Sequence, residues 1–139
     1  MQITRQADYA LRAMLYLARL EPHEQVSTRK IAEEMLIPTS FLAKIISQLS
    51  ITGLIRTVRG ARGGVSLASS TDEISLHDVV VSIDGPIQLN QCTHNPSVCP
   101  FGDTCPIHEV WCEAETWLVN KLKNTSLTML LEREAKRLK

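Results

Sequence analysis

The chain has 139 residues, which fits one domain or a small domain with a long appendage, and 44% of them are hydrophobic, which is enough for a core. Its formal net charge is +0, and no stretch approaches the roughly 18 apolar residues of a membrane span. The N-terminus lacks a basic region followed by a continuous apolar run, so we expect no signal peptide, no membrane partner and a cytoplasmic location. In that reducing compartment the 4 cysteines are expected to be ligands or redox groups rather than disulfides.

Three amphipathic helices are predicted in the first part of the chain. Apolar residues recur at helical spacing over residues 3–18 and predict the first helix. Ser27 or Thr28 can cap a short second helix. Thr39 or Ser40 can cap a third, whose apolar stripe continues for about three turns. The tight turn between the last two predicts a helix-turn-helix.

A glycine-rich hairpin follows the helical stop at Gly53. Residues 54–58 are predicted to form one strand, residues 59–64 a turn, and residues 65–68 the returning strand. Three helices followed by a basic-tipped hairpin are typical of a winged helix-turn-helix. The predicted fold class is therefore mainly α with a small β-hairpin wing.

Basic and acidic residues are unevenly distributed along the sequence. Residues 35–71 contain four basic and no acidic residues, whereas residues 63–120 contain no lysine or arginine. In a winged helix the third helix enters the major groove and the wing reaches phosphates or the minor groove. The expected DNA contacts are Thr39, Ser40, Lys44, Arg56, Arg59 and Arg62. The alternatives are a solvated basic turn or a phosphate-binding glycine loop, and the second is discounted because the GxxxxGK[ST] order is missing.

Beyond the wing, Ser75 can cap a helix that a Gly-Pro pair stops at residue 85. Pro106 suits the first turn of a long helix that ends near residue 123, and a final helix with a basic end follows. One apolar stripe of the long helix comprises Ile107, Val110, Trp111, Ala114, Leu118 and Leu122. A lone helix cannot bury this stripe, so we expect it to pair with the same helix of a second subunit, with packing on its own N-terminal domain as the alternative.

The predicted organisation has three parts. Residues 1–84 form a winged helix-turn-helix DNA-binding domain, residues 85–105 a cysteine loop, and residues 106–139 a dimerisation helix and tail. The dimer is expected to read a pseudo-palindromic site in double-stranded DNA, because a two-fold protein matches a two-fold operator.

The segment CTHNPSVCPFGDTC places three cysteines in one loop. Six residues separate Cys92 from Cys99, and five separate Cys99 from Cys105. Zinc sites usually hold pairs of ligands only two to four residues apart. Wider loops can wrap an iron-sulfur cluster, whose several irons offer coordination sites over a broader span. We therefore favour a cluster, with zinc and free or redox-active thiols as the alternatives.

Several segments together resemble one regulator family. They are ITRQADYALRAMLYLA, IPTSFLAKIISQLSITGLIRTVRGARGGVSLA, ISLHDVVVSIDG and the cysteine loop that runs into CPIHEVW. The chain is similar over nearly its whole length to the winged-helix family that includes IscR, NsrR, RirA and CymR. The resemblance implies a homodimeric transcription regulator in which Cys92, Cys99 and Cys105 hold a 2Fe-2S or 4Fe-4S cluster that changes DNA affinity. CymR-like members lack these cysteines and sense through a partner protein.

Two residues are candidates for the fourth cluster ligand. CPIHEVW resembles the IscR motif, which implies His108 and a 2Fe-2S cluster, and ADYALR resembles the NsrR motif, which implies Asp8 of the partner subunit and a 4Fe-4S cluster. The alternatives are a surface ion pair of Asp8 with Arg12 and a polar helix-start residue at His108. We interpret Cys112 as a packed thiol, with a spare ligand or oxidation partner as the alternative. His94 is interpreted as a solvated histidine.

These features predict a regulator, which we expect to be a repressor, controlled by a cluster that senses redox state, nitric oxide or iron and cluster status. The second hypothesis is a cluster-free winged-helix regulator controlled by a partner protein or by cysteine oxidation. We do not expect an enzyme, because a thiol-redox enzyme would need a CxxC pair or a cysteine beside a base. The first cysteine gap is one residue longer than in IscR-like sequences, and Ala43 stands where these can carry an acidic residue. The signal and the operator sequence of IscR-like proteins are therefore not assigned to this chain.

Overall fold

A computed structural model describes residues 2–139 of the chain, apart from the side chain of Asp103. Three helices build the N-terminal half: α1 (Arg5–Ala18), α2 (Thr28–Met35) and α3 (Thr39–Ile51). Ser27 caps α2, because its side chain accepts a hydrogen bond from the Lys30 N–H, as the sequence predicts. The predicted cap of α3 is wrong: Pro38 holds the N-cap position and no side chain caps this helix.

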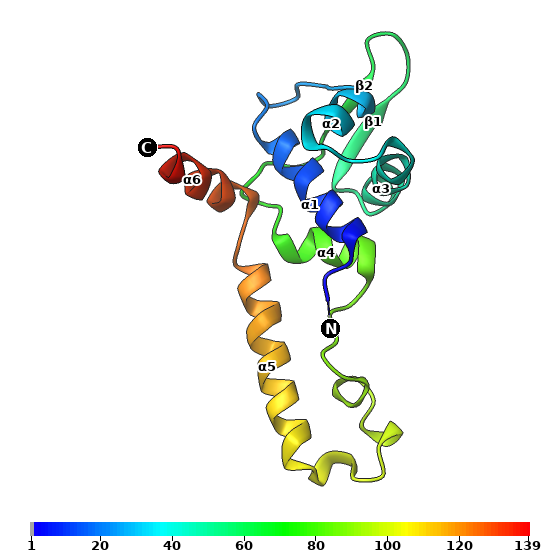
Figure 1. Cartoon of the computed structure of the whole chain (residues 1–139), viewed down its shortest axis with the longest axis vertical. Helices are drawn as coiled ribbons and strands as arrows, with labels where there is room; N and C mark the ends of the chain where they lie inside the picture. Colours follow the sequence, from blue (N-terminus) through cyan, green and yellow to red (C-terminus); the bar gives the residue numbers. More distant parts are fainter. Residues whose placement is uncertain (1) are drawn as a thin grey trace.

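The predicted wing is a two-stranded antiparallel hairpin. Strand β1 (Ile55–Val58) pairs with β2 (Gly64–Leu67), with Ile55 opposite Leu67 and Val58 opposite Gly64. A Cβ at position 64 would lie 2.7 Å from the Val26 carbonyl oxygen, so this strand needs glycine where the α1–α2 connection crosses it. The hairpin tip extends away from the rest of the domain (Figure 1).

The core lies around α1, between α3, the hairpin and α4 (Leu76–Asp84). Alanines on α1 let its neighbours approach closely, and Met14 is completely buried among them. Ser75 and Asp78 form a reciprocal capping box at the start of α4, which confirms the predicted start of this helix. Other fully buried side chains of the core are Ile31, Leu42, Ile45, Leu49 and Val79.

An arm extends from this domain (Figure 1). It consists of three short 3-10 turns, η1 (Gln91–Thr93), η2 (Pro96–Val98) and η3 (Gly102–Thr104), and the long helix α5 (Pro106–Lys123). Pro106 occupies the first turn of α5, as predicted. Among the described residues from 88 to 124, none is buried. The arm therefore has no core of its own.

The last helix, α6 (Leu127–Arg137), returns to the N-terminal domain and packs beside α1 (Figure 1). Leu127 is 0% exposed and belongs to the main core, and the Arg19 guanidinium forms a two-point ion pair with the Glu134 carboxylate. The sequence pattern indicated this helix but not its position. Across residues 2–139, no helix combines the length and the apolar character that crossing a bilayer would require.

Candidate functional site

The exposed face of α3 carries the predicted recognition residues. Thr39, Ser40 and Lys44 are all exposed, whereas the apolar side of the helix is buried in the core. Because Pro38 is the cap, the hydroxyls of Thr39 and Ser40 lie on the first helical turn and are not used as caps. The first turn of α3 has no acidic residue. Its N-terminal N–H groups and two hydroxyls can donate to a phosphate or a base edge.

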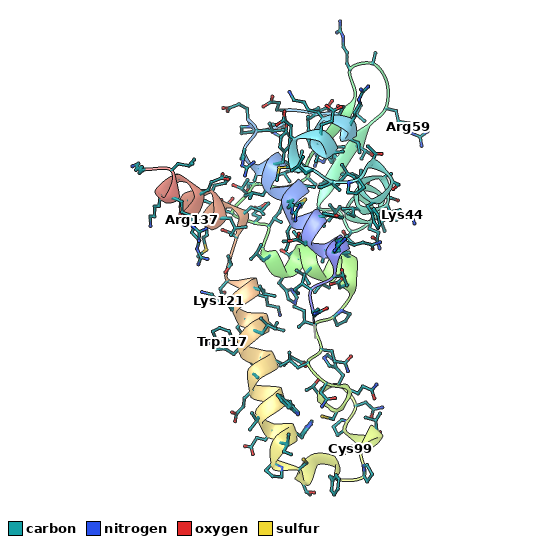
Figure 2. All side chains as sticks on the ribbon, viewed as in Figure 1. Lys44, Arg59, Cys99, Trp117, Lys121 and Arg137 are labelled. Carbon is teal, nitrogen blue, oxygen red and sulfur yellow. The ribbon has the colours of Figure 1, made fainter. Side chains whose placement is uncertain are left out.

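The arginines of the wing are exposed as well. Arg56 lies on β1 opposite Ser66, and Arg59 and Arg62 lie in the turn between the strands. Figure 2 shows Arg59 and Lys44 on the same side of the N-terminal domain. Among the described side chains, the ion pairs involve neither the three wing arginines nor Lys44. The recognition helix and the wing thus present unneutralised positive charge to one side.

The three loop cysteines lie in or next to the short turns of the arm. Cys92 lies in η1, Cys99 follows η2, and Cys105 is the N-cap residue of α5. Each is half-buried and none forms a disulfide. The donor chemistry suits an iron-sulfur cluster, since thiolates are its usual ligands. The side chains described do not gather any three cysteine, histidine or acidic groups around one point for a metal ion.

The two candidates for a fourth ligand lie in different parts of the protomer. His108 lies in the first turn of α5, three residues after Cys105, and its Nε2 atom is 3.5 Å from the Cys112 sulfur. Asp8 lies on α1 and forms an ion pair with Arg12, with 2.8 Å between Oδ2 and the guanidinium nitrogen. Cys99 is at the far end of the arm (Figure 2). His108 is therefore local to the loop, whereas Asp8 belongs to the N-terminal domain.

Sequence reasoning missed one contact of the loop. The Glu115 carboxylate on α5 accepts a hydrogen bond from the Leu89 N–H at 2.9 Å and lies 3.0 Å from His94 Nε2. His94 is therefore a paired residue and not simply solvated. The spacing of 21 positions between His94 and Glu115 carries no local signal, so only the fold reveals the pair.

The pKa of Glu115 reflects this setting. Burial raises it, but hydrogen bonds from Thr93 and the Leu89 N–H, together with the attraction and hydrogen bond of His94, outweigh burial, so the pKa lies below its usual value. The Thr93 hydroxyl also lies 2.7 Å from the Asn90 carbonyl oxygen. A hydroxyl has a single proton, so we treat Leu89 and His94 as the main partners of Glu115.

The outer face of α5 is apolar and open to solvent. Trp117 is 68% exposed, Ile107 60%, Val110 56% and Trp111 40%. Figure 2 shows Trp117 pointing away from the cysteine loop. Leu118 and Leu122 are half-buried, so the exposed row runs through Trp117 rather than through these two residues of the predicted stripe. Four large side chains on one helix face form an exposed apolar patch of the kind that marks interaction surfaces.

The fold and these surfaces define a winged-helix transcription regulator. The sequence profile of the Rrf2 family, described as iron-dependent transcriptional regulators, matches residues 3–133, and the chain belongs to this family. A curated relative is the HTH-type transcriptional regulator NsrR of Halalkalibacterium halodurans, which is 34% identical over 136 residues, covering 96% of this chain and 92% of NsrR. The resemblance predicted from the sequence is confirmed, and so is the prediction that the chain is not an enzyme.

Solved structures confirm the fold class. CymR, the global cysteine regulator of B. subtilis, is similar with a TM-score of 0.82 and 27% identity, over 96% of this chain and 98% of CymR. IscR of T. potens is similar with a TM-score of 0.77 and 23% identity, over 96% of this chain and 88% of IscR. This second likeness shows the fold alone. Proteins of this fold thus include one described as a global cysteine regulator.

Proposed function

We propose that this chain is a homodimeric repressor that binds a pseudo-palindromic operator and whose affinity is controlled by an iron-sulfur cluster. The observation that carries the proposal is the set of three half-buried thiols, Cys92, Cys99 and Cys105, in one loop and outside any disulfide. A regulator that senses its signal through a partner protein would not need these three thiols. The match to a family described as iron-dependent supports the same assignment.

For DNA binding, the support is geometric and electrostatic. Thr39, Ser40 and Lys44 are exposed on α3, and the wing arginines are free of acidic partners among the described side chains. In the proposed complex α3 enters the major groove and reads base edges. Arg56, Arg59 and Arg62 contact phosphates or the adjacent minor groove.

For the dimer, the support is the outer face of α5. Its exposed tryptophans and aliphatic residues have no core to enter within the described protomer. Pairing of this face with the same face of a second subunit would remove the patch from water. It would also place two recognition helices in one particle, as a two-fold operator requires.

For the cofactor, Cys92, Cys99 and Cys105 would supply three thiolate ligands. Bound there, a 2Fe-2S or 4Fe-4S cluster would supply a centre whose state responds to redox change, nitric oxide or iron supply. We propose His108 as the fourth ligand because it lies one helical turn from Cys105 in the same protomer. Asp8 is the alternative, and it would have to come from the partner subunit.

The ligand assignment is tested with two substitutions. If His108 serves, His108→Ala should shorten cluster lifetime or alter its spectrum, because an imidazole nitrogen would be lost from iron, and Asp8→Ala should leave both unchanged. The reverse sensitivities would assign Asp8 and a cluster shared between subunits. If both variants keep the wild-type spectrum and lifetime, neither residue is a ligand, and Cys112 becomes the next to test.

Cluster binding itself is tested by anaerobic purification. We expect a coloured protein with iron and acid-labile sulfide, and DNA affinity that changes when the cluster is removed. A variant with serine at Cys92, Cys99 and Cys105 should lack the colour, whereas Cys112→Ser, the matched control, should keep it. A colourless wild-type protein that still binds DNA would contradict the cluster.

The second candidate is a cluster-free regulator controlled by a partner protein or by cysteine oxidation. Two observations favour it: the structural likeness to CymR and the 3.5 Å contact between Cys112 and His108. An imidazole beside a thiol can stabilise the thiolate that oxidants attack. In that case DNA affinity should respond to peroxide in iron-free protein, and Cys112→Ser should abolish the response.

A further inference from the structure

The two ends of the cysteine loop are held in different ways. Cys105 is fixed because it is the N-cap residue of α5. Cys92 lies in the turn η1, and no regular helix or strand contains it. The position of Cys92 beside α5 therefore depends on contacts of the side chains around it.

Contacts of one α5 residue bracket Cys92 in the sequence. Glu115 accepts a hydrogen bond from the Leu89 N–H, three residues before Cys92, and pairs with His94, two residues after it. Both carboxylate oxygens are used, Oε2 at 2.9 Å from the Leu89 nitrogen and Oε1 at 3.0 Å from His94 Nε2. Two contacts on opposite sides of the turn restrain both its position and its rotation on the helix.

The imidazole is oriented by a second acceptor. His94 Nε2 lies 3.3 Å from the Ile87 carbonyl oxygen as well as 3.0 Å from Glu115. Because both neighbours are acceptors, Nε2 carries the proton and donates. Ile87 is buried, so this contact ties His94 to the point where the loop leaves the N-terminal domain.

The burial of Glu115 favours a lasting contact, although the His94 side chain is 47% exposed. The Glu115 side chain is only 14% exposed, although α5 has no fully buried residue in the described structure. Charge-assisted hydrogen bonds shielded from water are stronger than those on an open surface. Glu109 and Glu113, which lie on the same helix, are exposed. Glu115 is thus the acidic residue of α5 that the fold turns toward the loop.

We propose that Glu115 is a positioning residue, which anchors the segment 89–94 on α5 and thereby holds Cys92 in place for its role as a ligand. The inference rests on the proposed cluster site for its consequence, although the anchoring is a property of the protein without metal. An anchored ligand loses less conformational entropy when the cluster binds than a freely moving one.

The anchoring is tested first in metal-free, reduced protein. Glu115→Ala should make exchange of the Leu89 amide about fivefold to tenfold faster, because its acceptor is removed. Alkylation of Cys92 by iodoacetamide, followed by mass spectrometry, should also become faster, while that of Cys105 should not change. Glu113→Ala is the matched control and should alter neither rate. Unchanged exchange and alkylation in Glu115→Ala would overturn the proposal.

The consequence is tested in reconstituted protein. Glu115→Ala should hold less cluster and lose it several-fold faster in air, with far-UV circular dichroism and dimer content unchanged. Glu115→Gln keeps an acceptor for the Leu89 N–H but not the charge, so it should recover part of the lifetime. A variant whose loop is loosened in the metal-free protein but whose cluster content and lifetime equal those of the wild type would overturn the positioning role.

A double substitution separates anchoring from general loop damage. If Glu115 acts through His94, the effects of Glu115→Ala and His94→Ala on Cys92 alkylation should be less than additive. Full additivity would overturn the assigned partnership. If the wild-type protein binds no cluster, the proposed function fails, and the metal-free measurements still decide whether Glu115 anchors the loop.

Discussion

The N-terminal domain and the arm differ in how far they bury their apolar side chains. The domain buries apolar side chains from α1, α3, the hairpin, α4 and α6 in one core. The arm, residues 88–124, buries none of its described residues, although it contains two tryptophans and an 18-residue helix. A segment that buries no apolar side chains of its own needs contacts with another molecule to be held in one conformation. The domain therefore has a core of its own, whereas the arm has none, and under the proposed function a second subunit and a bound cluster would complete the arm.

The largest expected effect is on the free energy of unfolding, and it tests whether α6 belongs to the N-terminal domain. Leu127→Ala should lower the free energy of unfolding by about 2–5 kcal/mol, because Leu127 is 0% exposed and its loss leaves a cavity in the main core. Urea denaturation measures this change. Leu138→Ala, at an 84% exposed position of the same tail, is the control and should be nearly neutral. If the two variants were equally stable, α6 would not belong to the core of the domain.

The next effect is on assembly. Val110→Glu combined with Trp117→Glu should convert the proposed dimer to a monomer, since charges would be placed at two positions of the exposed row of α5. Analytical ultracentrifugation gives the mass, and urea denaturation should show an N-terminal domain of nearly unchanged stability. Leu36→Glu, at an 81% exposed site of the domain, should leave the dimer intact. A stable dimer that survives both changes would place the interface elsewhere.

A smaller effect is expected on the wing. Arg59→Ala or Arg62→Ala should weaken DNA binding and, where the lost contact is to phosphate, lower the salt slope by about one unit per contact. Fluorescence anisotropy on DNA selected with the wild-type dimer, at several salt concentrations, measures both. Arg29→Ala removes an exposed arginine that pairs with Glu33 on α2 and serves as the control. Wild-type affinity and slope in both wing variants would remove the hairpin from the interface.

The smallest expected effect is on the pH dependence of stability, through His77 near the junction of the arm and the domain. Burial and the nearby charge of Lys123 lower the pKa of His77, and these outweigh Asp78, which raises it. The unfolded chain therefore binds this proton more readily than the folded protein. Stability should fall as the pH drops below about 6.5, and the fall should stop once the pH passes below the folded pKa. Denaturation at several pH values should show a shallower fall in His77→Asn, and an identical pH dependence would show that the shift has no effect on stability.

Local signals in the sequence were sufficient for most secondary structure. Ser27, Ser75 and Pro106 mark helix starts through contacts that span three residues or through the fixed φ of proline, and the structure agrees at each position. The hairpin is likewise encoded by two short strand-forming segments on either side of a glycine-rich turn. Thr39 and Ser40 show the limit of such reasoning, because two adjacent cap formers do not reveal that Pro38 occupies the cap.

Tertiary structure alone decided which surfaces are free and which distant residues meet. The sequence showed an apolar stripe on α5, but only the fold turns Leu118 and Leu122 toward the chain and leaves Trp117 in solvent. The sequence also carried no indication that Leu127 packs in the core of the N-terminal domain or that Glu115 pairs with His94. Periodicity and capping act within a few residues, whereas these contacts depend on how separate elements pack. The order of elements and the cysteine motif were therefore encoded locally, and the anchoring of that motif was set by packing.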